Sequence, residues 1–308
     1  MATALGQQLS AHEEREFEDG EHKARPVDDV SGGDVYVVQS THSGPRQSAN
    51  DKLCRLLFFI GALKDAGAAR VTAVVPYLAY ARKDRRTKPN DPVTTRYVAS
   101  LFESVDTDCV VTLEVHNPAA FENAFRCRTV ALTGTPLFVD YVKATLPNDK
   151  LAVISPDAGG MKRAERLREA LETTLGRPVG KGLAEKRRSA GVVSGDLFAG
   201  NISGSTALIV DDLISTGGTL LRTARSARAA GAKRVMALVT HGLFMPGSAE
   251  VLADPALDQI VVSDAVPPFR LDRPEQNKKL TILPAASLLA ESLRRLHEGR
   301  NLTDLMVF

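Results

Sequence analysis

The chain has 308 residues, of which 44% are hydrophobic and 25% are charged, and its formal net charge is +2. This composition is typical of folded globular proteins and excludes disordered and fibrous classes, while the length favours about two domains. The balanced charge argues against a nucleic-acid partner, so a site for an anion must come from local clusters of Lys and Arg.

Cysteine usage and the start of the chain predict a cytoplasmic protein. Cys54, Cys109 and Cys127 lie in apolar or strand-like runs without metal-site spacing, as is usual for reduced structural thiols. The first ten residues lack the basic and apolar segments of a signal peptide. No apolar run approaches the roughly 20 residues that span a bilayer. We therefore expect no membrane partner.

The first half of the chain alternates between strand and helix patterns. Residues Val35–Gln39 form a short apolar run that is typical of a buried strand. Apolar residues at helical spacing follow from Leu53 to Leu63, Gly67 ends that helix, and Arg70–Val75 predict the next strand. The order of strand, helix and strand predicts a parallel sheet.

The same order returns in the second half. A strand over Ala207–Val210 is followed by a helix from Thr219 and by a strand over Val235–Val239. The sequences before the second strand of each half are also similar, AGAARV at 66–71 and AGAKRV at 230–235. The repeat suggests a duplicated α/β domain, although a glycine that ends a helix before a strand is common.

A turn-forming cluster at residues 146–149, with the sequence LPND, precedes the apolar strand Leu151–Ile154. It predicts a domain boundary, with residues 1–147 in the first domain and residues 148–308 in the second.

The end of the chain is predicted to form a helix followed by an apolar segment. Leu289, Leu293 and Leu296 share one helix face, and the helix is expected to end near Gly299. Because free tails are seldom this apolar, residues 302–308 are expected to dock back on the body or on another subunit.

An acidic pair and a loop of small residues follow the strand Ala207–Val210. The pair is Asp211 and Asp212, and the loop consists of Ser215, Thr216, Gly217, Gly218 and Thr219. Small residues let backbone N–H groups approach a phosphate, a helix N-terminus adds partial positive charge, and the hydroxyl groups add donors. Because the carboxylates would repel a phosphate, we expect them to face sugar hydroxyls or a magnesium ion. The alternative is a helix-capping loop with two solvated carboxylates.

Two common nucleotide motifs are missing. The sequence has no G-x-x-x-x-G-K-[ST] loop and no G-x-G-x-x-G after a strand. This disfavours P-loop and nicotinamide-dependent enzymes.

Five further segments narrow the interpretation. They are FEDGE at 17–21, YARKDR at 80–85, EVH at 114–116, SPDAGG at 155–160 and KRR at 186–188. With the loop described above, this set resembles the ribose-phosphate pyrophosphokinase family, also called phosphoribosyl pyrophosphate synthetases, from Phe17 to Phe308.

The resemblance implies a fold and an activity. The fold is α/β, with two tandem type I phosphoribosyltransferase-like domains, each a mainly parallel sheet flanked by helices. The first domain would serve ATP and the second ribose 5-phosphate. The activity is transfer of the β,γ-diphosphoryl group of ATP to the 1-hydroxyl of ribose 5-phosphate with Mg²⁺, which gives AMP and phosphoribosyl pyrophosphate.

The resemblance also implies residue roles. Lys186 and Arg188 match a catalytic lysine and arginine on a mobile hairpin, where they would stabilise charge on the transferring group. His116 and Asp157 match the magnesium ligands, but His116 could instead act through a metal-bound water, since nitrogen ligands are unusual for magnesium. Asp211 and Asp212 resemble the pair that binds the ribose 2- and 3-hydroxyls.

The implied ATP-binding residues are Phe17, Asp19, Gly20, Glu21, Arg82, Lys83 and His116. The Phe17–Glu21 segment would recognise adenine from a neighbouring subunit. The resemblance therefore implies a homo-oligomer, at least a dimer, in which a partner completes the ATP site.

Some positions depart from the family pattern. Lys83 stands where glutamine is usual and adds a positive charge beside the nucleotide, which leaves donor selectivity open. Ser215 and Gly217 replace a frequent aspartate and alanine. Residues 117–125 differ in a region that helps to form the regulatory site for ADP and phosphate, which leaves the regulation and the usual hexamer open.

Two other classes stay open at this point. A phosphoribosyltransferase would also use residues 210–219, but it needs neither the segment 17–21 nor a duplicated domain. A regulatory homologue without activity would lack parts of the active site. The residues expected to be lost in such a protein are all present: His116, Asp157, Lys186, Arg188 and Asp211.

Overall fold

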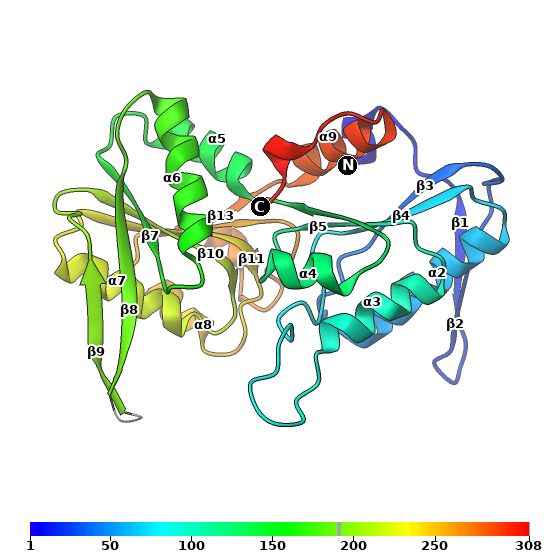
Figure 1. The fold of residues 1–308 in the computed structure, drawn as a ribbon, viewed down its shortest axis with the longest axis horizontal. Coiled ribbons are helices and arrows are strands. Elements are labelled where there is room, and N and C mark those ends of the chain that lie inside the picture. Colours follow the sequence, from blue (N-terminus) through cyan, green and yellow to red (C-terminus); the bar gives the residue numbers. More distant parts are fainter. Residues whose placement is uncertain (190–191, 308) are drawn as a thin grey trace. The chain divides into compact units, whose positions relative to one another are not determined.

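The computed structural model describes residues 1–189 and 192–307, without the side chains of residues 185–197 and Glu275 (Figure 1). Within the described residues the chain divides into two compact units. The first contains Met1–Thr133 and Ala286–Phe308, and the second contains Gly134–Ala285. Both contain parallel strands with helices, so the predicted α/β class is confirmed. No helix in these ranges is long and apolar enough to cross a membrane.

The first unit contains a parallel sheet with strand order β3-β4-β5-β6 and a separate antiparallel hairpin, β1-β2. The strands are β1 (His12–Glu16), β2 (His22–Pro26), β3 (Asp34–Val38), β4 (Arg70–Val75), β5 (Cys109–Leu113) and β6 (Arg128–Leu132). The helical segments are α1 (Ala2–Leu5), α2 (Ala49–Asp65), α3 (Thr94–Ser104), α4 (Pro118–Ala124), α9 (Ala286–His297) and the 3₁₀ helix η2 (Thr303–Leu305).

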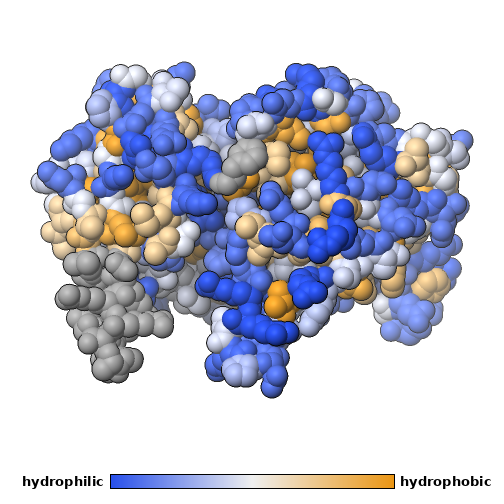
Figure 2. Space-filling model, in the orientation of Figure 1, coloured by the Kyte–Doolittle hydropathy of each residue, from blue (hydrophilic) through white to orange (hydrophobic). Residues whose placement is uncertain are grey.

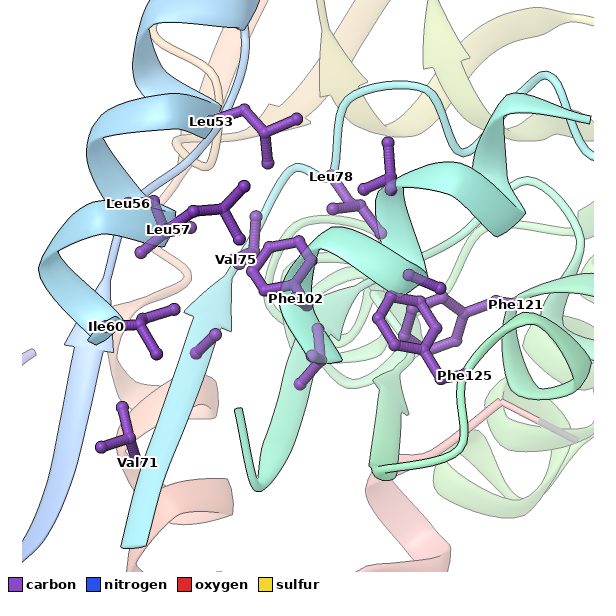
Figure 3. Close-up of a cluster of buried hydrophobic side chains, with 14 of the residues drawn as sticks. Leu53, Leu56, Leu57, Ile60, Val71, Val75, Leu78, Phe102, Phe121 and Phe125 are labelled. Carbon is purple, nitrogen blue, oxygen red and sulfur yellow. The ribbon is translucent and has the colours of Figure 1, made fainter. Parts of the chain in front are cut away.

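Helix α2 shows how the sequence pattern builds the first core. A capping box begins the helix, because the Ser48 side chain accepts a hydrogen bond from the Asp51 amide and the Asp51 carboxylate accepts one from the Ser48 amide. The buried face carries Leu53, Leu56, Leu57, Ile60 and Leu63. Figure 3 shows this face directed toward β4 and toward Phe102 of α3.

Strand β3 corrects one prediction. The run at 35–39 was expected to be a buried strand, but β3 is only half-buried, and 46% of Val38 is exposed. The reason is its place at the edge of the sheet, where it pairs with β4 alone. A short apolar run in the sequence does not show whether the strand lies at the edge or at the centre of its sheet.

The second unit contains one sheet with strand order β13-β12-β11-β10-β7-β8-β9, in which the β8-β9 pair is antiparallel. The strands are β7 (Leu151–Ser155), β8 (Gly180–Ser189), β9 (Val192–Ala199), β10 (Thr206–Ile214), β11 (Arg234–Gly242), β12 (Gln259–Ser263) and β13 (Leu280–Leu283). The helical segments are α5 (Thr135–Thr145), α6 (Met161–Leu175), α7 (Gly218–Ala229), α8 (Ser248–Ala253) and the 3₁₀ helix η1 (Pro274–Gln276).

Both faces of this sheet are buried, and alternate residues of each strand serve different cores. Ile154 and Ile209 pack with α7 and α8, whereas Val153 and Leu208 pack with α5 and α6. A parallel sheet covered on both faces needs continuous apolar strands, as the sequence has here.

The unit boundary differs from the one predicted between residues 147 and 148. Phe138, Val139 and Val142 of α5 pack in the core of the second unit, so that unit begins at Gly134. The turn cluster at 146–149 joins α5 to β7 inside this unit. A turn signal marks a change of direction, which occurs within domains as well as between them.

The C-terminal segment belongs to the first unit. Met306 forms an antiparallel bridge with Leu132, and the Val307 amide donates to the Ala131 carbonyl oxygen at 2.8 Å. The apolar tail thus lies along β6, where it covers an edge that would otherwise expose unpaired backbone groups. The predicted second domain, 148–308, is therefore not one continuous unit.

The predicted repeat is matched by the local geometry of the two units. Gly67 and Gly231 have φ angles of 87° and 88°, and each carbonyl accepts a hydrogen bond from another glycine amide, at 2.8 and 2.9 Å. In each unit an aspartate accepts a hydrogen bond from the backbone amide of the valine that follows the repeated arginine. Asp108 accepts it from Val71 and Asp258 from Val235, both at 2.7 Å. Such agreement in contacts supports a duplication.

A polar cluster holds α9 against the sheet of the first unit. Asp34 accepts hydrogen bonds from Arg70 and, at 2.9 Å, from the Tyr36 hydroxyl, and His297 Nδ1 lies 2.8 Å from Asp34 Oδ2. Burial by itself would raise the pKa of Asp34, but the bonds from Arg70, His297 and Tyr36 lower that pKa to about 2.

The substitution Asp34→Asn should lower the free energy of unfolding at pH 7 by about 1 kcal/mol, allowing for solvent screening. Because the pKa of Asp34 in the folded protein, about 2, lies below the ordinary aspartate pKa of 3.8, the stabilisation is present above pH 3.8 and is lost as the pH falls toward 2. Urea unfolding at pH 7 and pH 3 would measure this. The exposed Asp65→Asn is the control, and a difference between Asp34→Asn and wild type that did not shrink at pH 3 would contradict the prediction.

Candidate active site

Parallel pairing places the predicted residues of the second unit at one sheet edge. Strands β7 and β10 are neighbours, with Ile154 opposite Ile209. The loop that contains Asp157 follows β7, and the loop 215–217 follows β10. Because carboxyl ends of parallel strands meet at the same edge, these segments lie there together, in the usual position for ligand sites of α/β sheets.

The acidic pair lies within a strand, which corrects the sequence interpretation. Strand β10 was expected to end at Val210, but it continues to Ile214, with Asp211 opposite Val239 of β11. Asp212 is buried, and 26% of the Asp211 side chain is exposed. The strand therefore fixes the backbone of both carboxylates, which a loop would leave less constrained.

The electrostatics of the pair favour ligands that donate hydrogen bonds or carry positive charge. Burial, together with the neighbouring carboxylate of Asp212, raises the pKa of Asp211 to about 8. The Asp212 amide donates to Asp211 Oδ1 at 2.9 Å. Vicinal hydroxyl groups or a cation would stabilise the ionised pair, whereas an anion would be repelled.

Arg163 joins this pair, although the sequence reasoning missed it. Its Nη1 atom lies 3.6 Å from Asp211 Oδ1 and 3.9 Å from Asp212 Oδ1, and 12% of its side chain is exposed. Arg163 lies in the first turn of α6, which begins directly after the Asp157 loop. In the sequence Arg163 is only a cation shortly after the glycines 159 and 160, and this pattern does not predict which acidic residue it contacts.

The small-residue loop leads into α7, whose N-terminus faces the same edge. The N-cap is Gly217, with φ 84° and no side-chain cap, so amide groups of the first turn have no intrahelical partner. A Cβ atom at Gly217 would lie 2.9 Å from Val251 Cγ2. Both the backbone angle and this contact favour glycine, and the amide groups with the helix dipole favour a phosphate.

Hydroxyl groups and a further cation complete this loop. Ser215 is half-buried, and Thr216 and Thr219 are exposed. Arg222, which was not predicted, donates from Nη2 to Thr219 Oγ1 at 3.4 Å. The loop therefore combines donors of three kinds: backbone amides, hydroxyl groups and a guanidinium.

The Asp157 loop is held by its own backbone. Asp157 Oδ1 accepts from the Gly160 amide at 2.9 Å, and the Ser155 hydroxyl donates to the Asp157 carbonyl oxygen at 2.6 Å. A Cβ atom at Gly160 would lie 2.8 Å from Ser155 Oγ, so the loop needs a glycine there. Asp157 itself is exposed, and its Oδ2 atom has no hydrogen-bond partner among the described residues.

Lys186 and Arg188 lie on β8, but their side chains are outside the described part of the chain. The backbone nevertheless locates this segment. The last residue of β7, Ser155, pairs with Leu183, and from there β8 continues only with β9. Figure 1 shows this hairpin extending beyond the sheet. At about 3.3 Å per residue, Lys186 is about 10 Å past the end of β7.

The first unit gathers a second group of predicted residues. Arg82 and Lys83 lie in the loop between β4 and α3, and His116 follows β5, the neighbour of β4. Asn117 links the two segments, because its Nδ2 atom donates to Asp84 Oδ2 at 2.6 Å.

Backbone strain marks this edge. Tyr80 and Glu114 have φ angles of 66° and 51°, which non-glycine residues seldom adopt. They follow the ends of β4 and β5 respectively. Such angles persist only where surrounding contacts hold them, and they are frequent at functional sites.

The segment 17–21 forms the turn of the β1-β2 hairpin. The Phe17 amide donates to the Glu21 carbonyl oxygen at 2.8 Å, and Asp19 Oδ1 accepts from the Glu21 amide at 3.0 Å. Gly20 has a φ of 88°. The guanidinium of Arg15 lies 4.7 Å from the centre of the Phe17 ring, and so covers one face of it.

Known proteins match the chain over nearly its full length. Residues 1–105 match the model for the N-terminal domain of ribose phosphate pyrophosphokinase, and residues 185–307 match the phosphoribosyl synthetase-associated domain. A ribose-phosphate pyrophosphokinase of Hyphomonas neptunium is 34% identical over 306 residues, which cover 99% of this chain and 94% of that protein. The chain belongs to the ribose-phosphate pyrophosphokinase family.

Two more members of the ribose-phosphate pyrophosphokinase family agree with this assignment. Ribose-phosphate pyrophosphokinase A of Dictyostelium discoideum is 32% identical, over 94% of this chain and 87% of that protein. The crystal structure of phosphoribosylpyrophosphate synthetase from Mycobacterium smegmatis superimposes with a TM-score of 0.84 at 29% identity, over 97% of this chain and 94% of that one. The family resemblance inferred from the motifs is thus confirmed.

Replacing Arg163 with Met should raise the pKa of Asp211 further, because the guanidinium that favours the ionised carboxylate is lost. Carboxyl ¹³C NMR titration of aspartate-labelled protein would measure it. Arg222→Met, in the same unit, is the matched control. An unchanged or lower Asp211 pKa in Arg163→Met would show that Arg163 does not act on the pair.

Proposed function

We propose that the protein transfers the β,γ-diphosphoryl group of ATP to the 1-hydroxyl of ribose 5-phosphate. The observation that carries the proposal is the edge of the second sheet, where an acidic pair, half-buried Asp211 and buried Asp212, precedes a helix N-terminus without a side-chain cap. Such a site suits one ligand with vicinal hydroxyls and a phosphate. Membership of the ribose-phosphate pyrophosphokinase family supports the same reaction.

The acceptor would lie along this edge. Its 5-phosphate would bind the amide groups at the start of α7 and the hydroxyl groups of Ser215, Thr216 and Thr219. Its 2- and 3-hydroxyls would donate to Asp211 and Asp212, whose positions β10 and Arg163 hold. The 1-hydroxyl of the bound sugar would then be the group that attacks the donor, and transfer needs it to be held in a fixed orientation.

The donor would bind residues of the first unit. Arg82 and the exposed arginines near it suit the phosphates. The turn with Phe17, Asp19, Gly20 and Glu21 suits adenine. Because that turn is at the tip of a hairpin, we propose that it serves the ATP site of another subunit, in a homo-oligomer that is at least a dimer. The covered face of Phe17 leaves the other face for a base.

The reaction breaks one bond and forms one. The 1-hydroxyl oxygen attacks the β-phosphorus, the bond from that phosphorus to the α,β-bridging oxygen breaks, AMP leaves, and the hydroxyl proton passes to solvent. Negative charge develops on the transferring group. Lys186 and Arg188, on the hairpin beyond the sheet edge, would stabilise this charge. The lysine ammonium would supply a compact positive charge, and the arginine guanidinium a planar set of N–H donors.

We propose Asp157 as a magnesium ligand, and His116 as a residue that acts on the ion directly or through a metal-bound water. Among the residues that the structure describes, no group of three or more His, Cys, Asp or Glu side chains gathers as a metal site. Magnesium is commonly held by one or two carboxylates together with water and substrate phosphates, and Asp157 keeps one carboxylate oxygen for this. When bound, the ion would neutralise charge on the triphosphate.

Purified protein with ribose 5-phosphate, ATP and Mg²⁺ should release AMP and form phosphoribosyl pyrophosphate in equal amounts. Quantifying both products by chromatography, with and without each substrate, tests this. Absence of AMP at varied phosphate and metal concentrations would reject the proposal. Nucleotide formation that depended on an added base would identify a phosphoribosyltransferase.

The substitution Lys186→Ala should reduce kcat by about a hundredfold and change the KM of each substrate far less, because its charge acts on the transition state. Steady-state kinetics with both substrates varied would separate the two parameters. Lys181→Ala is the matched control, since Lys181 lies on the same strand at a position still paired with β7. Undiminished kcat in Lys186→Ala would remove this lysine from the mechanism.

A further inference from the structure

The loop between β4 and α3 holds its cations in two different states. Arg82, Arg85, Arg86 and Lys88 are exposed, and their side chains have no hydrogen-bond or ion-pair partner within residues 1–189 and 192–307. Lys83 is half-buried, and its Nζ atom lies 2.9 Å from Asp91 Oδ2. Lys83 is therefore the loop cation that an acidic neighbour already neutralises.

Asp91 closes this loop through one carboxylate oxygen. Besides Lys83 Nζ, Asp91 Oδ2 accepts from the Thr87 hydroxyl at 2.7 Å, the Thr87 amide at 3.1 Å and the Lys88 amide at 3.0 Å. The bonds from Thr87 and Lys83 hold the pKa of Asp91 well below its usual range. Residues 83–91 thus form a closed turn.

Two neutral side chains attach the closed turn to the unit. The Thr95 hydroxyl lies 3.0 Å from the Tyr80 carbonyl oxygen and 3.1 Å from the Lys83 carbonyl oxygen. Asn117 donates to Asp84 at 2.6 Å, and its Oδ1 atom accepts from the Ala120 amide of α4 at 3.2 Å. Lys83 and Asp84 are therefore anchored, whereas the arginines on either side of them are exposed.

The surface agrees with this division. The loop protrudes at the lower centre of Figure 1, and in the same orientation Figure 2 shows a mostly hydrophilic projection there. An exposed group of guanidinium groups on an anchored turn suits several phosphate groups in a row, because each guanidinium presents a planar fork of donors.

We propose that Asp91 is a positioning residue for the triphosphate of the donor, which keeps Lys83 from the phosphates and presents Arg82, Arg85 and Arg86 to them. The inference rests on the proposed function only in taking a nucleoside triphosphate as the ligand of this edge. It also explains how the chain accommodates a lysine beside the nucleotide, since Asp91 cancels its charge.

The alternative role for Lys83 makes opposite predictions, so a double-mutant cycle separates them. If Lys83 bound phosphate itself, Lys83→Gln would weaken nucleotide binding, Asp91→Asn would strengthen it, and the two effects would add. If the pair is a positioning device, each single substitution weakens binding, because it leaves an uncompensated charge or an open turn.

The experiment measures the binding of α,β-methylene-ATP by calorimetry to wild type, Lys83→Gln, Asp91→Asn and the double variant. In this analogue a methylene group replaces the α,β-bridging oxygen, so the proposed transfer cannot occur and binding alone is measured. We expect each single variant to raise Kd roughly tenfold, as for loss of one charge-assisted hydrogen bond, and the double variant to return to within about threefold of wild type. KM for ATP should follow, while KM for ribose 5-phosphate stays unchanged.

The control is Lys64→Gln, which breaks the 2.6 Å Lys64–Asp108 pair elsewhere in the unit and should leave Kd unchanged. Thermal melting confirms that each variant is folded. Additive effects, tighter binding by Asp91→Asn, or no binding by wild type would overturn the inference. Formation of phosphoribosyl pyrophosphate by wild type tests the proposed function separately, because the analogue measures binding without turnover.

Discussion

Neighbouring parallel strands bring their carboxyl ends to the same edge of a sheet, and both parts of the proposed site depend on this. In the second unit β7 and β10 place Asp157 and the acidic pair side by side. In the first unit β4 and β5 do the same for the loop of Arg82 and for His116. The repeated α/β arrangement thus supplies two comparable edges, which can take different ligands because their loops differ.

Charge compensation is the second constraint, and the two edges meet it differently. Asp212 is buried and Asp211 is half-buried, and Arg163 Nη1 lies 3.6 Å from Asp211 Oδ1 and 3.9 Å from Asp212 Oδ1. Both distances are longer than a normal hydrogen bond. In the first unit the Lys83–Asp91 pair is close, at 2.9 Å, and is held by further bonds. A loose pair suits a ligand site, whereas a tight pair suits a structural support.

Departures from the family pattern acquire physical meaning from their partners. Lys83, which would add a charge beside a nucleotide, is neutralised by Asp91. Asn117 begins the segment that departs from the family pattern, yet its side chain joins the loop between β4 and α3 to α4. The departures at Lys83 and Asn117 thus have partners in or beside the loop between β4 and α3. The family architecture is retained, as the TM-score of 0.84 to the Mycobacterium smegmatis enzyme shows.

The sequence by itself determined several of the strands, the repeat pattern and the family, because apolar periodicity and short motifs are local properties. For example, β4 and β7 begin at the predicted residues, Arg70 and Leu151. Only the tertiary structure decided properties that depend on distant partners. It placed the edge strand β3, moved the unit boundary to Gly134 and attached the tail to β6. It also showed that Arg163 pairs with the acidic residues and Lys83 with Asp91. Spacing along the chain does not predict which oppositely charged side chains come into contact after folding.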